Sequence, residues 1–164
     1  MDVHVAEFTA AAFAPYGEVI EQPARKADAA GNGWQWWGEM TLLPGEDGPY
    51  GVGYLNLQPG ALSVDWAERH MHSVELIIPV GSDCLIHVGP PDHLQDPSQL
   101  PELSRFQVFR VRRGQAVMLR PGVWHGAPLA IAEPLVAMVL LRQGTGQTDA
   151  TVVSFADRQL DIRL

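Results

Sequence analysis

Short runs of alternating apolar and polar residues recur along this chain of 164 residues, and proline- and glycine-containing turns separate them. Residues 50–57 and 106–111 show the alternation clearly. Such runs are typical of half-buried β-strands, and turns every 8–12 residues or so indicate a sandwich or barrel. We therefore predict an all-β fold with one short helix at residues 9–14, capped by Thr9. The expected strands are 18–21, 34–43, 50–57, 62–66, 68–78, 84–88, 106–111, 116–119, 123–125, 135–141 and 151–155.

Two polar segments, at residues 22–33 and 89–104, are expected to be loops, and residues 44–49 a turn. No linker or change of composition divides the chain, so we expect a single domain over residues 1–164. Three tryptophans, Trp34, Trp36 and Trp37, begin the strand expected at 34–43. They could belong to the core, cover the barrel mouth, line a pocket, or close a homodimer by protecting a sheet edge.

Composition limits the possible partners. The chain is 46% hydrophobic and 18% charged, as globular proteins are, and its formal net charge is −8. That charge argues against binding nucleic acid or an anionic membrane, but allows a small carboxylate ligand near a few arginines. Cys84 is the only cysteine, which excludes an intramolecular disulfide and a thiolate zinc cluster. With neither a signal peptide nor a membrane-length apolar run apparent, we expect a cytoplasmic protein.

The stretch from Glu68 to Glu75 is the strongest candidate for chemistry. Strand alternation would place Glu68, His70 and His72 on one face, whereas Glu75 needs a bend or bulge to join them. Imidazole and carboxylate groups together are suitable ligands for divalent metals. With His125, this stretch predicts a metal-binding or acid–base pocket inside the barrel.

The stretch 68–75 and the segment 120–125 each resemble one of the two motifs of the cupin superfamily, a jelly-roll barrel. The first motif normally provides His-x-His and a glutamate, and the second a further histidine. If Glu68 and His70 form the pair, the spacing to Glu75 fits the motif. We therefore predict a site for a divalent metal at Glu68, His70, Glu75 and His125, with His72 as a possible replacement for Glu68.

A closer resemblance, to the ureidoglycolate lyase family, covers nearly the whole chain. It rests on residues 12–21, Glu68-Arg69-His70, Ile78-Pro79, Gly122-Val123-Trp124-His125 and Arg142. The resemblance implies a cupin-type barrel, usually a homodimer. It also implies conversion of ureidoglycolate to glyoxylate and urea, a step of allantoin degradation in purine metabolism.

Several positions depart from the family's pattern. Glu75 stands where the family usually has Gln, Arg120 where it has His, and Gly126 where a second His follows His125. The Asn-Asn-Gly peptide of the family's early loop has only residues 31–33 as a counterpart. These departures bear on the exact substrate more than on the fold.

The reaction that the resemblance implies needs a base for the hydroxyl proton, an acid for the leaving urea nitrogen and a cation for the carboxylate. We predict that His125 and Glu75 act as base and acid, beside His70, and that a metal could instead polarise the substrate. Substrate-binding candidates are Arg120, Arg142 and Trp124, although Trp124 also suits packing.

Arg69 alternates with His70, so it should face away from the pocket. His87 and His93 are expected to have no role in the site. Two other functions remain open, namely another metal-dependent cupin enzyme acting on a small hydroxy acid, and a ligand-binding barrel without catalysis.

Overall fold

The computed structural model describes residues 1–43, 48–96, 99–155 and 158–164. These residues form mainly strands, with short helices α1 and α2 and a 3-10 turn η1. The elements are β1 (Asp2–Ala6), α1 (Ala10–Phe13), β2 (Gly17–Ile20), β3 (Ala29–Gly31), β4 (Trp34–Trp36), β5 (Tyr50–Leu57), β6 (Ser63–Val64), β7 (Trp66–His70), β8 (Glu75–Pro79), β9 (Cys84–Gly89), η1 (Leu103–Arg105), β10 (Gln107–Val111), β11 (Ala116–Leu119), β12 (Trp124–His125), β13 (Leu129–Ala130), β14 (Leu135–Arg142), α2 (Thr145–Thr148), β15 (Ala150–Ser154) and β16 (Leu160–Arg163).

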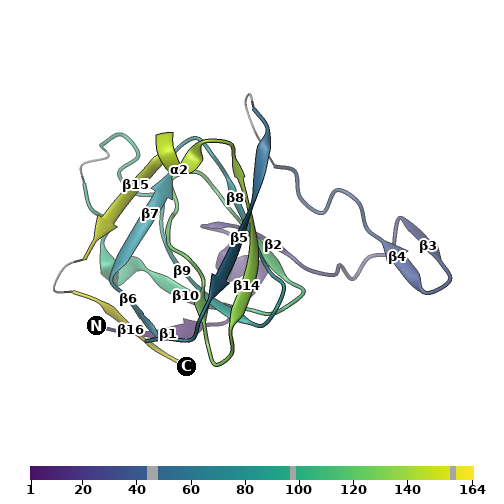
Figure 1. Ribbon diagram of the computed structural model, residues 1–164, viewed down its shortest axis with the longest axis horizontal. Helices are drawn as coiled ribbons and strands as arrows, with labels where there is room; N and C mark the ends of the chain where they lie inside the picture. The colour runs from purple at the N-terminus through teal and green to yellow at the C-terminus, as the bar shows by residue number, and fades with distance from the viewer. Residues whose placement is uncertain (44–47, 97–98, 156–157) are drawn as a thin grey trace.

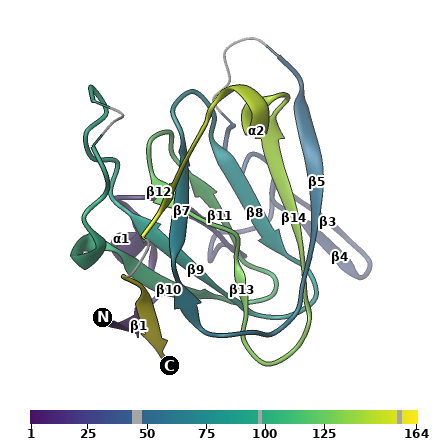
Figure 2. The same cartoon turned by 60° about the vertical axis from the view of Figure 1, so that its left-hand side comes forward.

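Two curled sheets face each other, and a small separate hairpin projects to one side (Figures 1 and 2). The larger sheet has the order β15-β7-β12-β9-β10-β1-β16-β6, with β13 paired to β9. The smaller sheet has the order β2-β11-β8-β14-β5, and β3 and β4 form the hairpin. The predicted all-β, cupin-type class is confirmed.

The main core lies between the two sheets, where side chains from both inner faces meet. On β9, Cys84, Ile86 and Val88 belong to this core, whereas Leu85 points to the opposite face. This is the period-two alternation that the sequence predicted. Burial raises the pKa of the Cys84 thiol to about 12, with the charge of Asp83 adding to the effect. The lone cysteine is therefore a packing residue.

Several predicted elements need correction. The Thr9 hydroxyl caps α1 as expected, accepting the Ala12 N–H at 3.1 Å. However, the prediction of a single short helix was wrong, because α2 forms after the Gly144 turn. The strand expected over 34–43 is limited to β4, and β3 forms within the expected loop 22–33. Strands β1, β13 and β16 were missed. Parts of the predicted 44–49 turn and 89–104 loop, at 44–47 and 97–98, lie outside the described residues.

The β3–β4 hairpin stands away from the two sheets on the right of Figure 1. Near its base, the Trp37 indole N–H donates to the Arg25 carbonyl at 3.0 Å, and Arg25 pairs with Asp28. Trp36, which pairs with Ala29 at the open end of the hairpin, is 61% exposed. Among the described residues, no helix has the length and apolar character required to cross a membrane.

A second apolar cluster covers the outer face of the larger sheet. Phe106 packs there, and its ring stacks on His87 with 6.3 Å between ring centroids. His87 is only 2% exposed. Burial lowers its pKa to about 3, the charge of His125 adds to the effect, and the backbone of Trp66 opposes it. His87 is therefore neutral in the folded protein.

This burial predicts a loss of stability in acid. The unfolded chain takes up a proton on His87 near pH 6.5, whereas the folded protein does so only near pH 3. Between these values the unfolded state binds more protons, so the free energy of unfolding falls as pH falls, by up to about 1.4 kcal/mol per pH unit. His87→Leu should remove this contribution in urea denaturation curves measured from pH 7 to pH 4.

The exposed His93 provides the control. Its backbone has a positive φ of 52°, which asparagine tolerates, so His93→Asn should behave as the wild type does. A constant stability difference between wild type and His87→Leu across this pH range would contradict the prediction.

Candidate active site

A sharp bend between β7 and β8 determines which side chains enter the barrel. Strand β7 ends at His70, and β8 begins at Glu75. The Asp149 carboxylate holds the bend, because its two oxygens accept the backbone N–H groups of Met71 and His72, each at 2.9 Å. The bend changes the phase of the alternation, so Glu75 returns to the interior and His72 is left exposed.

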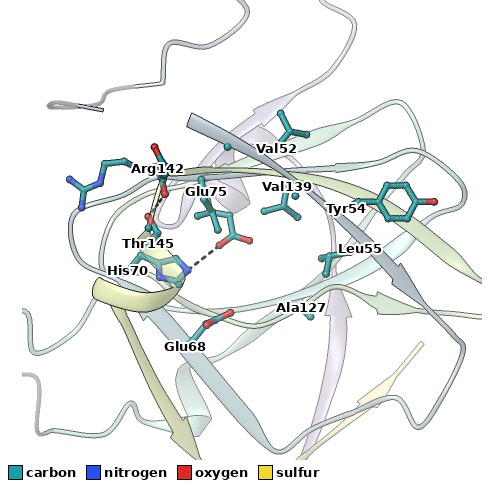
Figure 3. A pocket seen from close by; sticks show the side chains of 16 residues that line it. Val52, Tyr54, Leu55, Glu68, His70, Glu75, Ala127, Val139, Arg142 and Thr145 are labelled. Atoms are coloured by element: carbon teal, nitrogen blue, oxygen red, sulfur yellow. Dashed lines mark hydrogen bonds and ion pairs between the residues drawn. The ribbon is translucent and has the colours of Figure 1, made fainter. Parts of the chain in front are cut away.

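The Glu75 carboxylate lies between two imidazole rings. Its Oε2 atom is 2.9 Å from Nε2 of His125 and 3.2 Å from Nε2 of His70. The two rings meet edge to face, with centroids 5.2 Å apart. All three side chains are buried, and Figure 3 shows Glu75 and His70 directed toward each other. The structure thus brings together three of the residues that the sequence predicted.

Backbone carbonyl groups fix the outer nitrogen of each ring. Nδ1 of His125 lies 2.9 Å from the carbonyl oxygen of Val123, and Nδ1 of His70 lies 3.2 Å from that of Asp149. A carbonyl oxygen only accepts, so each Nδ1 carries the hydrogen. Both Nε2 atoms are therefore directed into the site, which is how metal-binding histidines are usually oriented.

Glu75 and His125 each favour the charged form of the other. Burial raises the pKa of Glu75, but the charge and hydrogen bond of His125, and those of His70, outweigh it and lower that pKa to about 2. Burial lowers the pKa of His125, but Glu75, the Val123 carbonyl and Glu68 together raise it above its ordinary value. The contact therefore favours the carboxylate form of Glu75 and the protonated form of the His125 ring.

Glu68 completes a group that could hold a metal ion. One ligand atom from each of Glu68, His70 and His125 can be chosen so that all lie within 4.8 Å of one another. The three come from neighbouring strands, because His125 of β12 stands opposite Glu68 of β7. Two imidazoles and a carboxylate form a donor set that borderline divalent metals accept.

A cavity of about 500 Å³ opens beside this cluster. Glu68, His70 and Glu75 line one part of it, together with Arg142 and Thr145 (Figure 3). Figure 3 shows the Arg142 guanidinium extended away from Glu75, beyond Thr145. Arg142 thus belongs to the cavity wall, with its guanidinium directed away from Glu75.

Three of the predicted site residues belong neither to the cavity lining nor to the cluster around Glu75. Arg120, which directly follows β11, is exposed and donates to the Ala14 carbonyl at 2.7 Å. Trp124 is buried in the outer cluster because it precedes the inward-facing His125 on β12. His72 is exposed at the bend. The predictions that Arg120 and Trp124 bind substrate, and that His72 replaces Glu68, are therefore corrected.

Arg69 faces away from the pocket, as expected. It is fully buried on the outer face of β7, with its guanidinium carbon 4.4 Å from the centre of a Trp124 ring. One of its nitrogens donates to the Asp92 carbonyl at 2.7 Å. The contact explains the burial of both side chains.

Sequence reasoning missed Asp149. This residue is nearly buried and supports both the bend and the orientation of His70, through its carboxylate and its carbonyl respectively. It lies 79 positions from His70 along the chain. The only local signal is an acidic residue three positions after Gly146, which is common on protein surfaces.

The model of the family described as ureidoglycolate lyase matches residues 1–162. This chain belongs to the ureidoglycolate lyase family. The ureidoglycolate lyase of Azotobacter vinelandii (strain DJ) is 30% identical over 142 residues, covering 83% of this chain and 82% of that protein. The ureidoglycolate lyase of Rhizobium etli (strain CIAT 652) is 30% identical over 143 residues, covering 84% and 82%. The family predicted from the sequence is confirmed.

Solved structures are more distantly similar to this family member. An oxalate decarboxylase from Lactobacillus farciminis matches with a TM-score of 0.44 and 15% identity, over 67% of this chain but only 28% of that chain. A 3,4-ketoisomerase from Thermoanaerobacterium thermosaccharolyticum has a TM-score of 0.45 and 16% identity, over 61% and 63%. Neither likeness bears on activity.

The role of Asp149 leads to a prediction. In Asp149→Asn, an amide nitrogen replaces one acceptor oxygen, so one buried N–H of the bend loses its partner. The free energy of unfolding should fall by about 1–3 kcal/mol, as for other buried groups left unsatisfied. Hydrogen exchange at the Met71 and His72 amides should accelerate.

Asp83 offers a matched control, because its carboxylate accepts the Arg113 N–H at 3.0 Å in a turn away from the site. Asp83→Asn should leave exchange at the bend unchanged. Unaltered exchange at Met71 and His72 in Asp149→Asn would show that Asp149 does not hold the bend.

Proposed function

We propose that this chain is a ureidoglycolate lyase that releases urea and glyoxylate, as in allantoin degradation. The observation that carries the proposal is the Glu75 carboxylate held between His70 and His125 beside a cavity. A charged proton acceptor in a buried, preorganised site is what removal of a hydroxyl proton needs. Family membership and the names of the relatives support the choice of substrate.

A divalent metal fits the donor set. Glu68, His70 and His125 would hold it, with Glu75 as a further ligand or as its neighbour. The two carboxylates would repel an anionic substrate, and a bound cation would offset them. Such an ion would act as a Lewis acid toward the substrate's oxygen atoms.

The protein's own groups can move the proton. The Glu75 carboxylate, ionised because of its low pKa, accepts the hydroxyl proton of ureidoglycolate. The carbon–nitrogen bond breaks as the carbonyl of glyoxylate forms, and the proton passes to the leaving urea nitrogen. His125 Nε2, directed at the same carboxylate oxygen, is a second proton donor where no metal occupies it.

Arg142 is proposed to bind the substrate's carboxylate. It lies at the end of β14 on the cavity wall, so rotation of its side chain would bring the guanidinium to a ligand. A guanidinium binds a carboxylate through two parallel hydrogen bonds, which would also fix the orientation of the reacting carbon.

We also propose that residues 1–164 act as one domain, in the cytoplasm and as a homodimer. A buried, sole cysteine suits a reducing compartment. For the dimer, the support is an apolar outer face on the smaller sheet, where Val52, Tyr54 and Val80 are exposed. An apolar face of this kind on an acidic chain suits a second copy, because it lets two negative molecules meet without apposing charges.

The test of the activity is urea release from ureidoglycolate by the purified protein as isolated, after chelation, and after a divalent metal is restored. Release well above the spontaneous rate is expected. Loss on chelation and recovery on restoration would support the metal site. No release in all three states would refute the lyase proposal.

Glu75→Gln introduces the residue that the family resemblance gives at this position. It should still lower kcat about 10²–10⁴-fold in the same assay, because this chain would lose the carboxylate proposed as its general base. The exposed Glu133 offers a control, and Glu133→Gln should retain full activity. Unchanged turnover in Glu75→Gln would exclude proton transfer by Glu75.

For the dimer, sedimentation equilibrium at micromolar concentration should show two copies for the wild type and for Val152→Asp, which alters an exposed residue of the other sheet. Val80→Asp should be monomeric, because it buries a charge in the proposed interface. A monomeric wild type would refute the dimer.

A further inference from the structure

The cavity beside Glu75 has two chemically different ends. Figure 3 shows Arg142 and Thr145 on one side of Glu75, and Val139, Leu55 and Tyr54 on the other. Of the two inner side chains at the second end, Val139 belongs to the main core and Leu55 packs against it. The reacting groups therefore stand between a polar end and an apolar end.

Two glycines create the room at the apolar end. Gly51 and Gly53 of β5 line the cavity, in phase with the inward-facing Leu55. A Cβ atom at Gly53 would meet nothing nearer than 3.5 Å, and one at Gly51 nothing nearer than 3.9 Å. Neither residue is among the glycines with positive φ. Backbone geometry therefore does not require glycine at either position.

Glycine weakens a strand, so its use twice on one face of an eight-residue edge strand has a cost. A strand glycine often marks a place where a ligand approaches the backbone closely. Here the missing side chains widen the cavity to about 500 Å³, within the range of about 300–1,000 Å³ typical of drug-sized ligands.

Ureidoglycolate does not use this space. It carries a carboxylate, a hydroxyl and a urea group, and has no hydrocarbon chain. With its carboxylate toward Arg142 and its reacting carbon at Glu75, the distal urea nitrogen is the atom left to point toward Val139 and Leu55. An apolar group on that nitrogen would cover the apolar wall and release its water.

We propose that the natural substrate class of this site is N-substituted ureidoglycolates, with an apolar substituent on the distal urea nitrogen. This inference rests on the proposed lyase function. The same carbon–nitrogen bond breaks, the hydroxyl proton moves to the leaving nitrogen, and the products are glyoxylate and a mono-substituted urea. No oxidant or additional reactant is needed.

The experiment compares ureidoglycolate with its N′-butyl derivative as substrates of the wild-type protein. The butyl compound should have a kcat/KM at least about tenfold higher, because each buried methylene contributes about fourfold. Gly53→Val should reduce this preference at least about tenfold by filling the space. Gly51→Ala should reduce it less, and thermal unfolding of both variants checks that they fold.

Gly60 provides the matched control, since a Cβ there meets nothing within 4 Å, its φ is not positive and it does not line the cavity. Gly60→Val should keep the wild-type preference. Turnover of ureidoglycolate with equal or poorer turnover of the butyl compound would overturn this inference and leave the lyase function standing.

If neither compound is turned over, the lyase function fails, and binding still tests the apolar end. By titration calorimetry, butylurea should bind the wild type at least about tenfold more tightly than urea does, and Gly53→Val should remove the difference. Equal binding of the two ureas to the wild type would overturn the inference independently of catalysis.

Discussion

The hydrogen bonds from the bend to Asp149 are the constraint on which the rest of the site depends. A strand continued without interruption from His70 would place His72 inside and Glu75 outside. The two oxygens of one buried carboxylate accept two consecutive N–H groups and so stabilise the change of direction. The same residue's carbonyl orients His70, so the backbone path and the ring position are determined together.

The charged glutamate at position 75 gives the site electrostatics that a glutamine there would not give. An amide would hydrogen-bond to the imidazoles without favouring their protonated form. The carboxylate instead raises the pKa of His125 and remains ionised itself. With Glu68 nearby, the site holds two acidic side chains, which would repel an acidic ligand unless positive charge offset them, the role that we propose for a bound cation and for Arg142.

The local alternation of apolar and polar residues predicted the barrel and about half of the site residues. Period-two alternation placed Glu68 and His70 on one face correctly, and the turn before His125 directed that residue inward. Alternation failed at His72 because the bend depends on a residue distant in sequence. Trp124 was misjudged because neighbours on a strand face opposite sides, and Arg120 because its partner is a carbonyl after α1. Contacts of this kind leave no local trace in the sequence.

The two ends of the described chain lie side by side: β1 pairs in parallel with β16, joining Asp2 to Asp161 and His4 to Arg163. During synthesis the first strand therefore leaves the ribosome long before its partner exists. Until then, one edge of β1 is available to other chains, which is a condition that favours misassembly. The β1–β16 pairing can therefore form only after the intervening chain has been made, and sequence-distant pairing of this kind favours slow folding.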